Sequence, residues 1–337
     1  VLSIAMFYGP AEGILRGGAL ALDVAGPYLV ARLSIRSLTD LRRLLVLMAP
    51  GVFLAGLSMM IESITQTQIV SPLAAKVFGA LPTYADGAET GMARSFVNFR
   101  YGLLRGAGPF AHPIPGGLFL ASLLPLYFSS GLRNWPRKMG LAAGAMAFFS
   151  VSSAAILSML IFAVLTAYDR LQRFFAFASW RVFLVLASIL LLVVELGSQN
   201  GLVSIISRYT FNPGTAYSRL LIWEYGTQSI ARNPLWGIAF TDYERASWMS
   251  NSIDNHWLLL GVRHGLVVPV ALLTLSIVTI FGVSMAGNQH GEADRRLYVG
   301  IAVAVFALAL SGFTVAFFGG LLTWFVLLLG IGISVSG

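Results

Sequence analysis

The residues that suggest chemistry in this sequence lie in and directly after a long polar stretch, residues 198–255. This stretch holds Arg219 and Asp254, and His256 follows it. A long polar segment between apolar runs usually carries function. The guanidinium of an arginine donates two parallel hydrogen bonds to a phosphate and stays protonated, while a carboxylate near an imidazole suits proton removal. We therefore expect an anion site beside a general base.

A second polar stretch, residues 62–115, contains the segment RGAGPFAHPIPGG, which opens with Arg105. Its glycines and prolines predict a largely non-helical turn whose backbone N–H groups can also point at an anion. We assign Arg100, Arg105 and His112 to the same anion as Arg219. The alternative for His112 is that it only caps or packs against the following helix.

The segment around Arg219 predicts an amphipathic helix that Thr215 or Ser218 caps and that Asn233-Pro234 ends. An arginine in the first turn of a helix is unfavourable for the helix dipole, which an anionic partner would explain.

Asp254 and His256 have two interpretations each. Asp254 is either the cap of the next helix or part of the base, and His256 is either an interfacial side chain or the proton acceptor. Because an imidazole accepts a proton near neutral pH, we expect His256 to be the acceptor and Asp254 to orient its ring through a hydrogen bond.

Several kinds of site find no support in the sequence. Cysteine is absent, and HExxH, GxSxG and P-loop motifs are missing. We therefore expect no tightly bound catalytic metal and no cofactor.

The composition places these residues in a membrane protein. Hydrophobic residues make up 57% of the chain and charged residues 11%, whereas a soluble domain has about 25% charged residues. The net charge of +8 would suit a nucleic-acid-binding protein, but only two of the 22 basic residues are lysines and many lie between apolar runs. The positive-inside rule explains them better, so no nucleic-acid partner is expected.

We expect an all-α polytopic protein of about 8–10 membrane helices forming a single domain over residues 1–337, with further helices before Val1. Basic segments mark the cytoplasmic side, which places residues 62–115 and 198–255 outside, the second as a large helical loop. Arginines in these outer loops indicate an anionic partner, although they would also neutralise nearby acids or bind lipid headgroups. The expected spans are 15–31 (weak, interrupted by Gly and Pro), 44–61, 116–130, 139–167 (a pair turning near 150–153), 182–197, 257–286 (lipid-facing only from Gly265), 297–312 and 314–334.

Three motifs in this order resemble the bacterial O-antigen ligase and O-antigen polymerase superfamily. They are RGAGPFAHPI before a span, SRLLIW followed by NPLWGIAF in the large outer loop, and SIDNHWLLLGVRHGL entering the next span. The resemblance covers roughly residue 32 to the C-terminus. It implies a GT-C-like, metal-independent glycosyltransferase in the bacterial inner membrane with its active site facing the periplasm.

The resemblance also implies an undecaprenyl-diphosphate-linked glycan as the donor, with Arg105 and Arg219 holding the diphosphate. Asp254 stands where the family has a histidine, which favours an O-antigen or exopolysaccharide polymerase. The expected partners are this glycan, membrane lipid and, as a candidate, a chain-length regulator. The alternatives are a ligase that uses lipid A core or a protein as acceptor, and a non-enzymatic transporter or flippase.

Overall fold

The computed structural model describes residues 1–78, 99–172 and 213–337, together with a few isolated positions between 174 and 193. The predicted span 182–197 and the arginines at 94 and 208 lie largely or wholly outside this part of the chain. The described elements are α1 (Leu2–Tyr8), α2 (Pro10–Ser34), α3 (Leu38–Thr65), α4 (Val70–Phe78), β1 (Phe99–Arg100), β2 (Leu103–Leu104), α6 (Pro113–Ser129), α7 (Asn134–Met146), the 3₁₀ turn η1 (Ala147–Ser150), α8 (Ser153–Leu171), α11 (Pro213–Arg232), α12 (His256–His264), α13 (Val267–Asn288), α14 (Glu292–Ser311) and α15 (Gly320–Ser336).

Helix α6 forms the centre of the main core. It is apolar on every face, which is typical of a helix surrounded by others, and 13 of its 17 residues are buried. It packs against α7, α8 and α14. Two polar contacts fix its neighbours: the Tyr127 hydroxyl donates to the Leu45 carbonyl (2.7 Å), and the Trp324 indole N–H donates to the Ser122 hydroxyl (2.8 Å).

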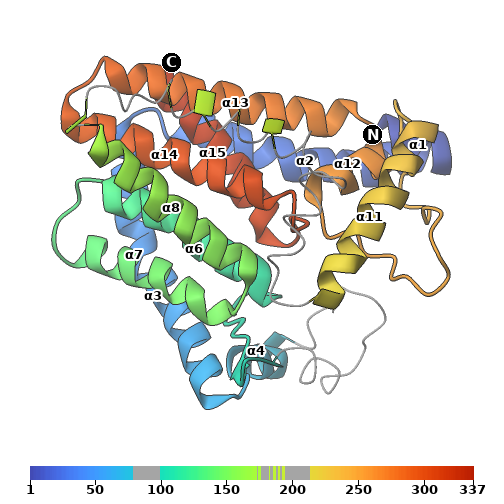
Figure 1. Cartoon of the computed structure of the whole chain (residues 1–337), viewed down its shortest axis with the longest axis horizontal. Coiled ribbons are helices and arrows are strands. Elements are labelled where there is room, and N and C mark those ends of the chain that lie inside the picture. Colours follow the sequence, from blue (N-terminus) through green and yellow to red (C-terminus); the bar gives the residue numbers. More distant parts are fainter. Residues whose placement is uncertain are drawn as a thin grey trace.

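The other helices pack around this core (Figure 1). Helices α13, α14 and α15 lie side by side, α2 packs on α15, and α3 packs on α7. Helix α11 stands at the opposite side of the molecule from α7 and packs against α12. Ile222 of α11, Tyr243 of the following loop and Leu258 of α12 belong to a small separate core.

Among the described residues, four helices are long and apolar enough to cross a membrane: α2, α3, α8 and α13. Two shorter helices, α6 and α15, are also apolar. The all-α class and the membrane character are therefore confirmed, while the number of about 8–10 spans stays a prediction. The expected interruption of the first span is wrong, because α2 continues through Gly17, Gly18 and Pro27.

One predicted turn is confirmed, and two other features differ from the prediction. The chain turns between α7 and α8 at residues 147–152, but the single span expected over 257–286 is divided, because the helix that starts at His256 stops at His264 and α13 begins at Val267. Between α14 and α15, however, the connection is eight residues long (312–319) rather than one. The fold also contains a small hairpin, β1–β2, that the all-α prediction omitted.

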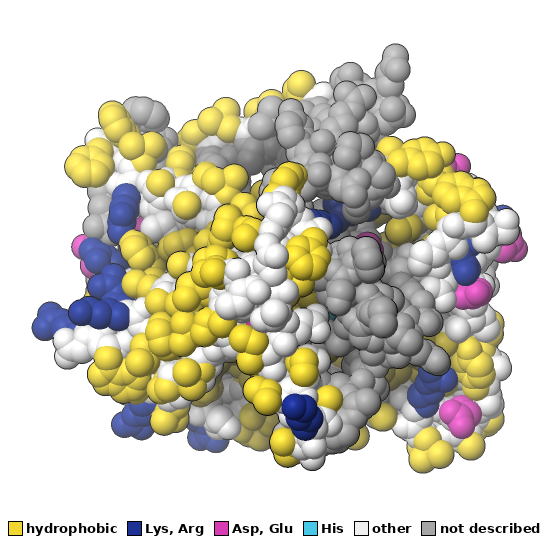
Figure 2. All heavy atoms as spheres, turned by 90° about the horizontal axis from the view of Figure 1, so that it is seen from below, with side chains coloured by type: hydrophobic (Ala, Val, Ile, Leu, Met, Phe, Trp, Pro, Cys, Tyr) yellow, Lys and Arg dark blue, Asp and Glu magenta, His cyan; other side chains and the backbone are white. Residues whose placement is uncertain are grey.

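The segments predicted to be cytoplasmic meet at one end of the helices. The Arg42 guanidinium donates to the Ser130 carbonyl (2.9 Å) and to Asp294 (2.6 Å), and Arg295 contacts Asp169 at 3.4 Å. Figure 2 shows Lys and Arg side chains gathered at one edge of the molecule beside a broad apolar surface. The ends of the predicted outer loops lie at the opposite end, where the candidate site is found.

Candidate functional site

The Arg105 loop is held in place by the buried carboxylate of Glu62. One oxygen accepts hydrogen bonds from the backbone N–H groups of Ala107 (3.0 Å) and Gly108 (2.8 Å). The other accepts from Ile69 and Val70, both at 3.0 Å. The prediction that this loop directs backbone N–H groups at an anion is therefore wrong for these two, because Glu62 already occupies them.

Arg105 itself is buried, with 5% of its surface exposed. Its Nε donates to the Ser150 carbonyl at 3.3 Å, but its buried Nη2 has no partner among the described residues. Burial and, to a smaller extent, the nearby charge of Arg100 lower the pKa of Arg105 to about 10. A buried guanidinium without a carboxylate is costly, and an anionic ligand would relieve that cost.

The hairpin β1–β2 places Arg100 beside Arg105. Tyr101 and Gly102 form its turn, both with positive φ (52° and 76°), as two-residue hairpins prefer. The turn is fixed by Gln66, whose side-chain amide donates to the Gly102 carbonyl at 2.8 Å.

Arg219 approaches the same region from α11. Its Nη2 donates to the Thr314 carbonyl at 3.3 Å, and its buried Nε has no partner among the described residues. Burial lowers the pKa of Arg219, Asp254 raises it and Arg100 lowers it. Arg100 thus interacts electrostatically with both other arginines, so the structure brings the predicted anion-binding arginines together beside Asp254.

The predicted start of α11 is wrong. The helix begins at Pro213, so neither Thr215 nor Ser218 is its cap and Arg219 lies in the second turn. The argument from the helix dipole therefore loses its force, because that effect is strongest in the first turn. The predicted end is confirmed, since α11 stops at Arg232 before Asn233-Pro234.

His256 is buried at the start of α12, with 1% of its surface exposed. Its ring stacks on Phe317 at a centroid distance of 4.4 Å, and its Nδ1 accepts the Phe317 backbone N–H at 3.3 Å. This network assigns the proton of the neutral ring to Nε2, which is buried without a partner among the described residues. Burial lowers the pKa of His256 to about 3, so the ring is a weak base.

The expected Asp254–His256 hydrogen bond is not formed. Asp254 is exposed and accepts from the Ser252 hydroxyl at 3.1 Å, while the acceptor nitrogen of His256 is used by Phe317. Nor is Asp254 the cap of α12. Asn255 caps it, with its side-chain oxygen accepting from Leu258 N at 3.0 Å.

His112 caps α6, in agreement with the alternative assigned to it. Its Nδ1 accepts from Ile114 N at 3.2 Å, and its ring contacts Phe318 edge to face. This nitrogen is therefore occupied by the helix N-terminus rather than directed at an anion.

The connection between α14 and α15, residues 312–319, joins the predicted site residues. Thr314 contacts Arg219, Phe317 contacts His256, and Phe318 contacts His112. The Gly312 carbonyl also accepts the His256 backbone N–H at 2.7 Å. Sequence reasoning missed this segment because it is largely apolar and carries no charge.

No protein-family model matches the chain, and no curated protein or solved structure is significantly similar to it.

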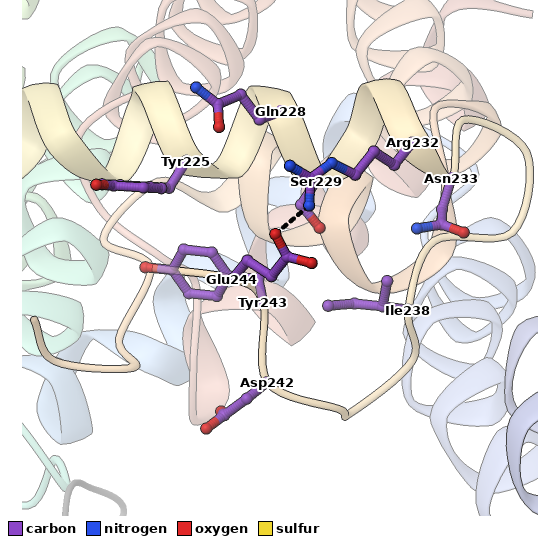
Figure 3. A pocket seen from close by; sticks show the side chains of 9 residues that line it. All are labelled: Tyr225, Gln228, Ser229, Arg232, Asn233, Ile238, Asp242, Tyr243 and Glu244. Atoms are coloured by element: carbon purple, nitrogen blue, oxygen red, sulfur yellow. Dashed lines mark hydrogen bonds and ion pairs between the residues drawn. The ribbon is translucent and has the colours of Figure 1, made fainter. Parts of the chain in front are cut away.

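A separate hollow of about 110 Å³ lies along α11 away from these residues (Figure 3). Arg232 points into it and pairs with Glu244 from the following loop. Arg245 likewise contacts Asp242 at 3.3 Å. These two outer arginines are therefore neutralised by acids, which was the alternative to an anionic ligand. Arg105 and Arg219, in contrast, have no acidic partner in hydrogen-bonding contact within the described chain.

Proposed function

We propose that this protein polymerises lipid-linked oligosaccharide repeat units of an O-antigen or exopolysaccharide. It would transfer the glycan from an undecaprenyl-diphosphate donor to a sugar hydroxyl, without a metal, at the periplasmic face of a bacterial inner membrane. The observation that carries the proposal is the pair Arg105 and Arg219, each of which has a buried guanidinium nitrogen without a partner among the described residues. Arginines of this kind suit a diphosphate, whose charge would satisfy both.

The reaction needs charge stabilisation on one side and proton removal on the other. The acceptor hydroxyl attacks the anomeric carbon, the bond from this carbon to the diphosphate oxygen breaks, and its electron pair stays on the diphosphate. Arg100, Arg105 and Arg219 stabilise the charge that develops there. Attack opposite the leaving group inverts the anomeric centre.

We assign proton removal to Asp254 rather than to His256. Asp254 is exposed and lies within the electrostatic reach of Arg219, so a substrate held there is close to it. His256 acts as a positioning residue that holds Phe317, and its Nε2–H remains to donate to a substrate oxygen.

The decisive assay incubates the purified protein with lipid-linked repeat units alone. Longer lipid-linked glycans would support the polymerase. A product that appears only after lipid A core is added would identify a ligase instead, and transport without any covalent product would identify a transporter.

The arginine role is tested by comparing two positions on the same helix. Arg219→Lys should lose about 2–4 kcal/mol of transition-state stabilisation, which lowers kcat/KM roughly 30- to 1000-fold. The reason is that lysine lacks the planar guanidinium with its two parallel N–H donors. Arg232→Gln, which breaks only the exposed pair with Glu244, should leave turnover unchanged. Near-normal turnover in a well-folded Arg219→Ala protein would rule out the diphosphate role.

A further inference from the structure

A second basic pocket lies at the opposite end of the helices from the candidate site. Its volume is about 120 Å³, and residues from α6, α7, α8 and α14 line it. Of the charged side chains around it, three are arginines (Arg137, Arg170 and Arg296) and one is an aspartate, Asp169. We propose that this pocket binds the phosphate headgroup of an anionic glycerophospholipid.

The positive charge of the pocket is only partly neutralised by the protein. The guanidinium groups of Arg137 and Arg170 both lie over the ring of Phe128, at 5.9 Å and 4.9 Å from its centroid. Arg137 also donates to the Phe128 carbonyl at 3.4 Å. Two cations that converge on one ring repel each other, and an anion between them removes that repulsion.

Within the described part of the chain, the two nearby acids form ion pairs with other arginines. Asp169 contacts Arg295 at 3.4 Å, and Glu292 contacts Arg296 at 2.8 Å. The Nε of Arg137 is buried and has no hydrogen-bond partner in the described part of the chain. A donor of this kind, in a cavity that is open to a ligand, is satisfied by a phosphate oxygen.

The surroundings favour a lipid over a free ion. The outward face of α8 is apolar, and Leu157, Leu160 and Val164 are 40–57% exposed. An acyl chain would cover this face while the headgroup reaches the basic pocket, which is how anionic lipids are bound between membrane helices. The floor of the pocket is closed by Gly300, where a Cβ atom would lie 2.7 Å from the Pro125 carbonyl oxygen.

The test counts bound lipids on the intact protein by native mass spectrometry. Phosphatidylglycerol and phosphatidylethanolamine with the same acyl chains are titrated separately, and inorganic phosphate is titrated as a third probe. Wild-type protein should retain one phosphatidylglycerol in preference to phosphatidylethanolamine. Arg137→Gln should weaken this binding about tenfold, the value of one charge-assisted hydrogen bond.

The matched control is Arg133→Gln, which removes an exposed arginine from the connection just before α7. Its affinity for phosphatidylglycerol should equal that of the wild type. Added phosphatidylglycerol should also raise the unfolding temperature of wild-type and Arg133→Gln protein more than that of Arg137→Gln. This second measurement separates lost binding from a folding defect.

Two results would overturn the proposal. Equal losses in Arg133→Gln and Arg137→Gln would show general attraction by the basic end of the molecule. Tight, Arg137-dependent binding of inorganic phosphate with no preference between the two lipids would show a site for a free ion.

Discussion

At the scale of single residues, the function of an arginine in this protein depends on its partner. Arg42, Arg295 and Arg296 each contact a carboxylate, whereas among the described residues the hydrogen-bond partners of Arg105 and Arg219 are backbone carbonyls. The two groups cannot be separated by residue type, because the chain has only two lysines among its 22 basic residues. What distinguishes them is whether a carboxylate is in direct contact with the guanidinium, which only the folded chain shows.

His256 provides a prediction on pH. Its pKa is lowered to about 3 by burial, below the ordinary value of about 6.5. The unfolded chain therefore binds more protons than the folded chain between these two values, so stability is complete above about pH 6.5 and falls as pH drops. The contribution of His256 is about 1.4 kcal/mol per pH unit in this range.

The measurement is the unfolding temperature between pH 7 and pH 5. His256→Asn should have a shallower pH dependence than the wild type. If His256→Asn has the wild-type slope, the ring is not held neutral by burial.

At the scale of elements, Glu62 links α3, the start of α4 and the Arg105 loop. Its carboxylate accepts four backbone N–H groups. In Glu62→Gln the side-chain NH₂ would face two of these donors, at a cost of about 1–3 kcal/mol. The unfolding temperature should fall, and the Arg105 site should lose activity with it.

The control for this variant is Glu244→Gln, since the Glu244 side chain is 81% exposed. Losing its pair with Arg232 should cost less than about 1 kcal/mol. Comparable destabilisation in both variants would argue against the role of Glu62.

A second element-scale prediction concerns the break between α12 and α13. Gly265 has φ 79° and ψ 174°, a region that only glycine adopts readily. A Cβ atom there would lie 2.2 Å from the Leu235 carbonyl oxygen. Gly265→Ala should therefore destabilise the protein by about 2–4 kcal/mol in thermal unfolding.

Gly51→Ala in α3 is the matched substitution, because a Cβ atom meets nothing within 4 Å there. It should be neutral or should stabilise by up to about 1 kcal/mol, given the higher helix propensity of alanine. Destabilisation by Gly51→Ala as large as that by Gly265→Ala would contradict the steric explanation.

The sequence predicted the elements better than their contacts. Runs of apolar residues located most of the described helices, but the break between α12 and α13 was not predicted, because Arg263 and His264 indicated only where the lipid-facing part of the span begins. The pairing of Asp254 with His256 was wrong because the partner of His256, Phe317, is 61 residues away in sequence. Glu62 did leave a signal, since an acidic residue at the end of an apolar span is expensive unless it is used.

At the scale of the whole molecule, the described segments form two chemically different ends. Arg42, Ser130, Asp169 and Asp294 belong to one end, and Glu62, Arg105, Arg219 and His256 belong to the other. The assignment of these ends to the cytoplasm and the periplasm stays a prediction from charge bias.

Cysteine labelling tests this assignment, because the chain has no native cysteine. Ser71→Cys and Ser247→Cys should react with an impermeant maleimide from the outer side of intact cells. Gln289→Cys, in the connection between α13 and α14, should react only after the membrane is opened. Labelling of Ser71→Cys and Ser247→Cys from opposite sides would exclude a shared site.

The arginines without acidic partners also determine which buffers suit this protein. Phosphate, sulfate and citrate carry the same compact negative charge that a guanidinium recognises in a diphosphate. In such buffers the proposed donor site would be filled by the buffer anion, and the apparent KM for the proposed donor would rise with buffer concentration. A zwitterionic buffer with chloride salts would leave Arg105 and Arg219 without this competitor.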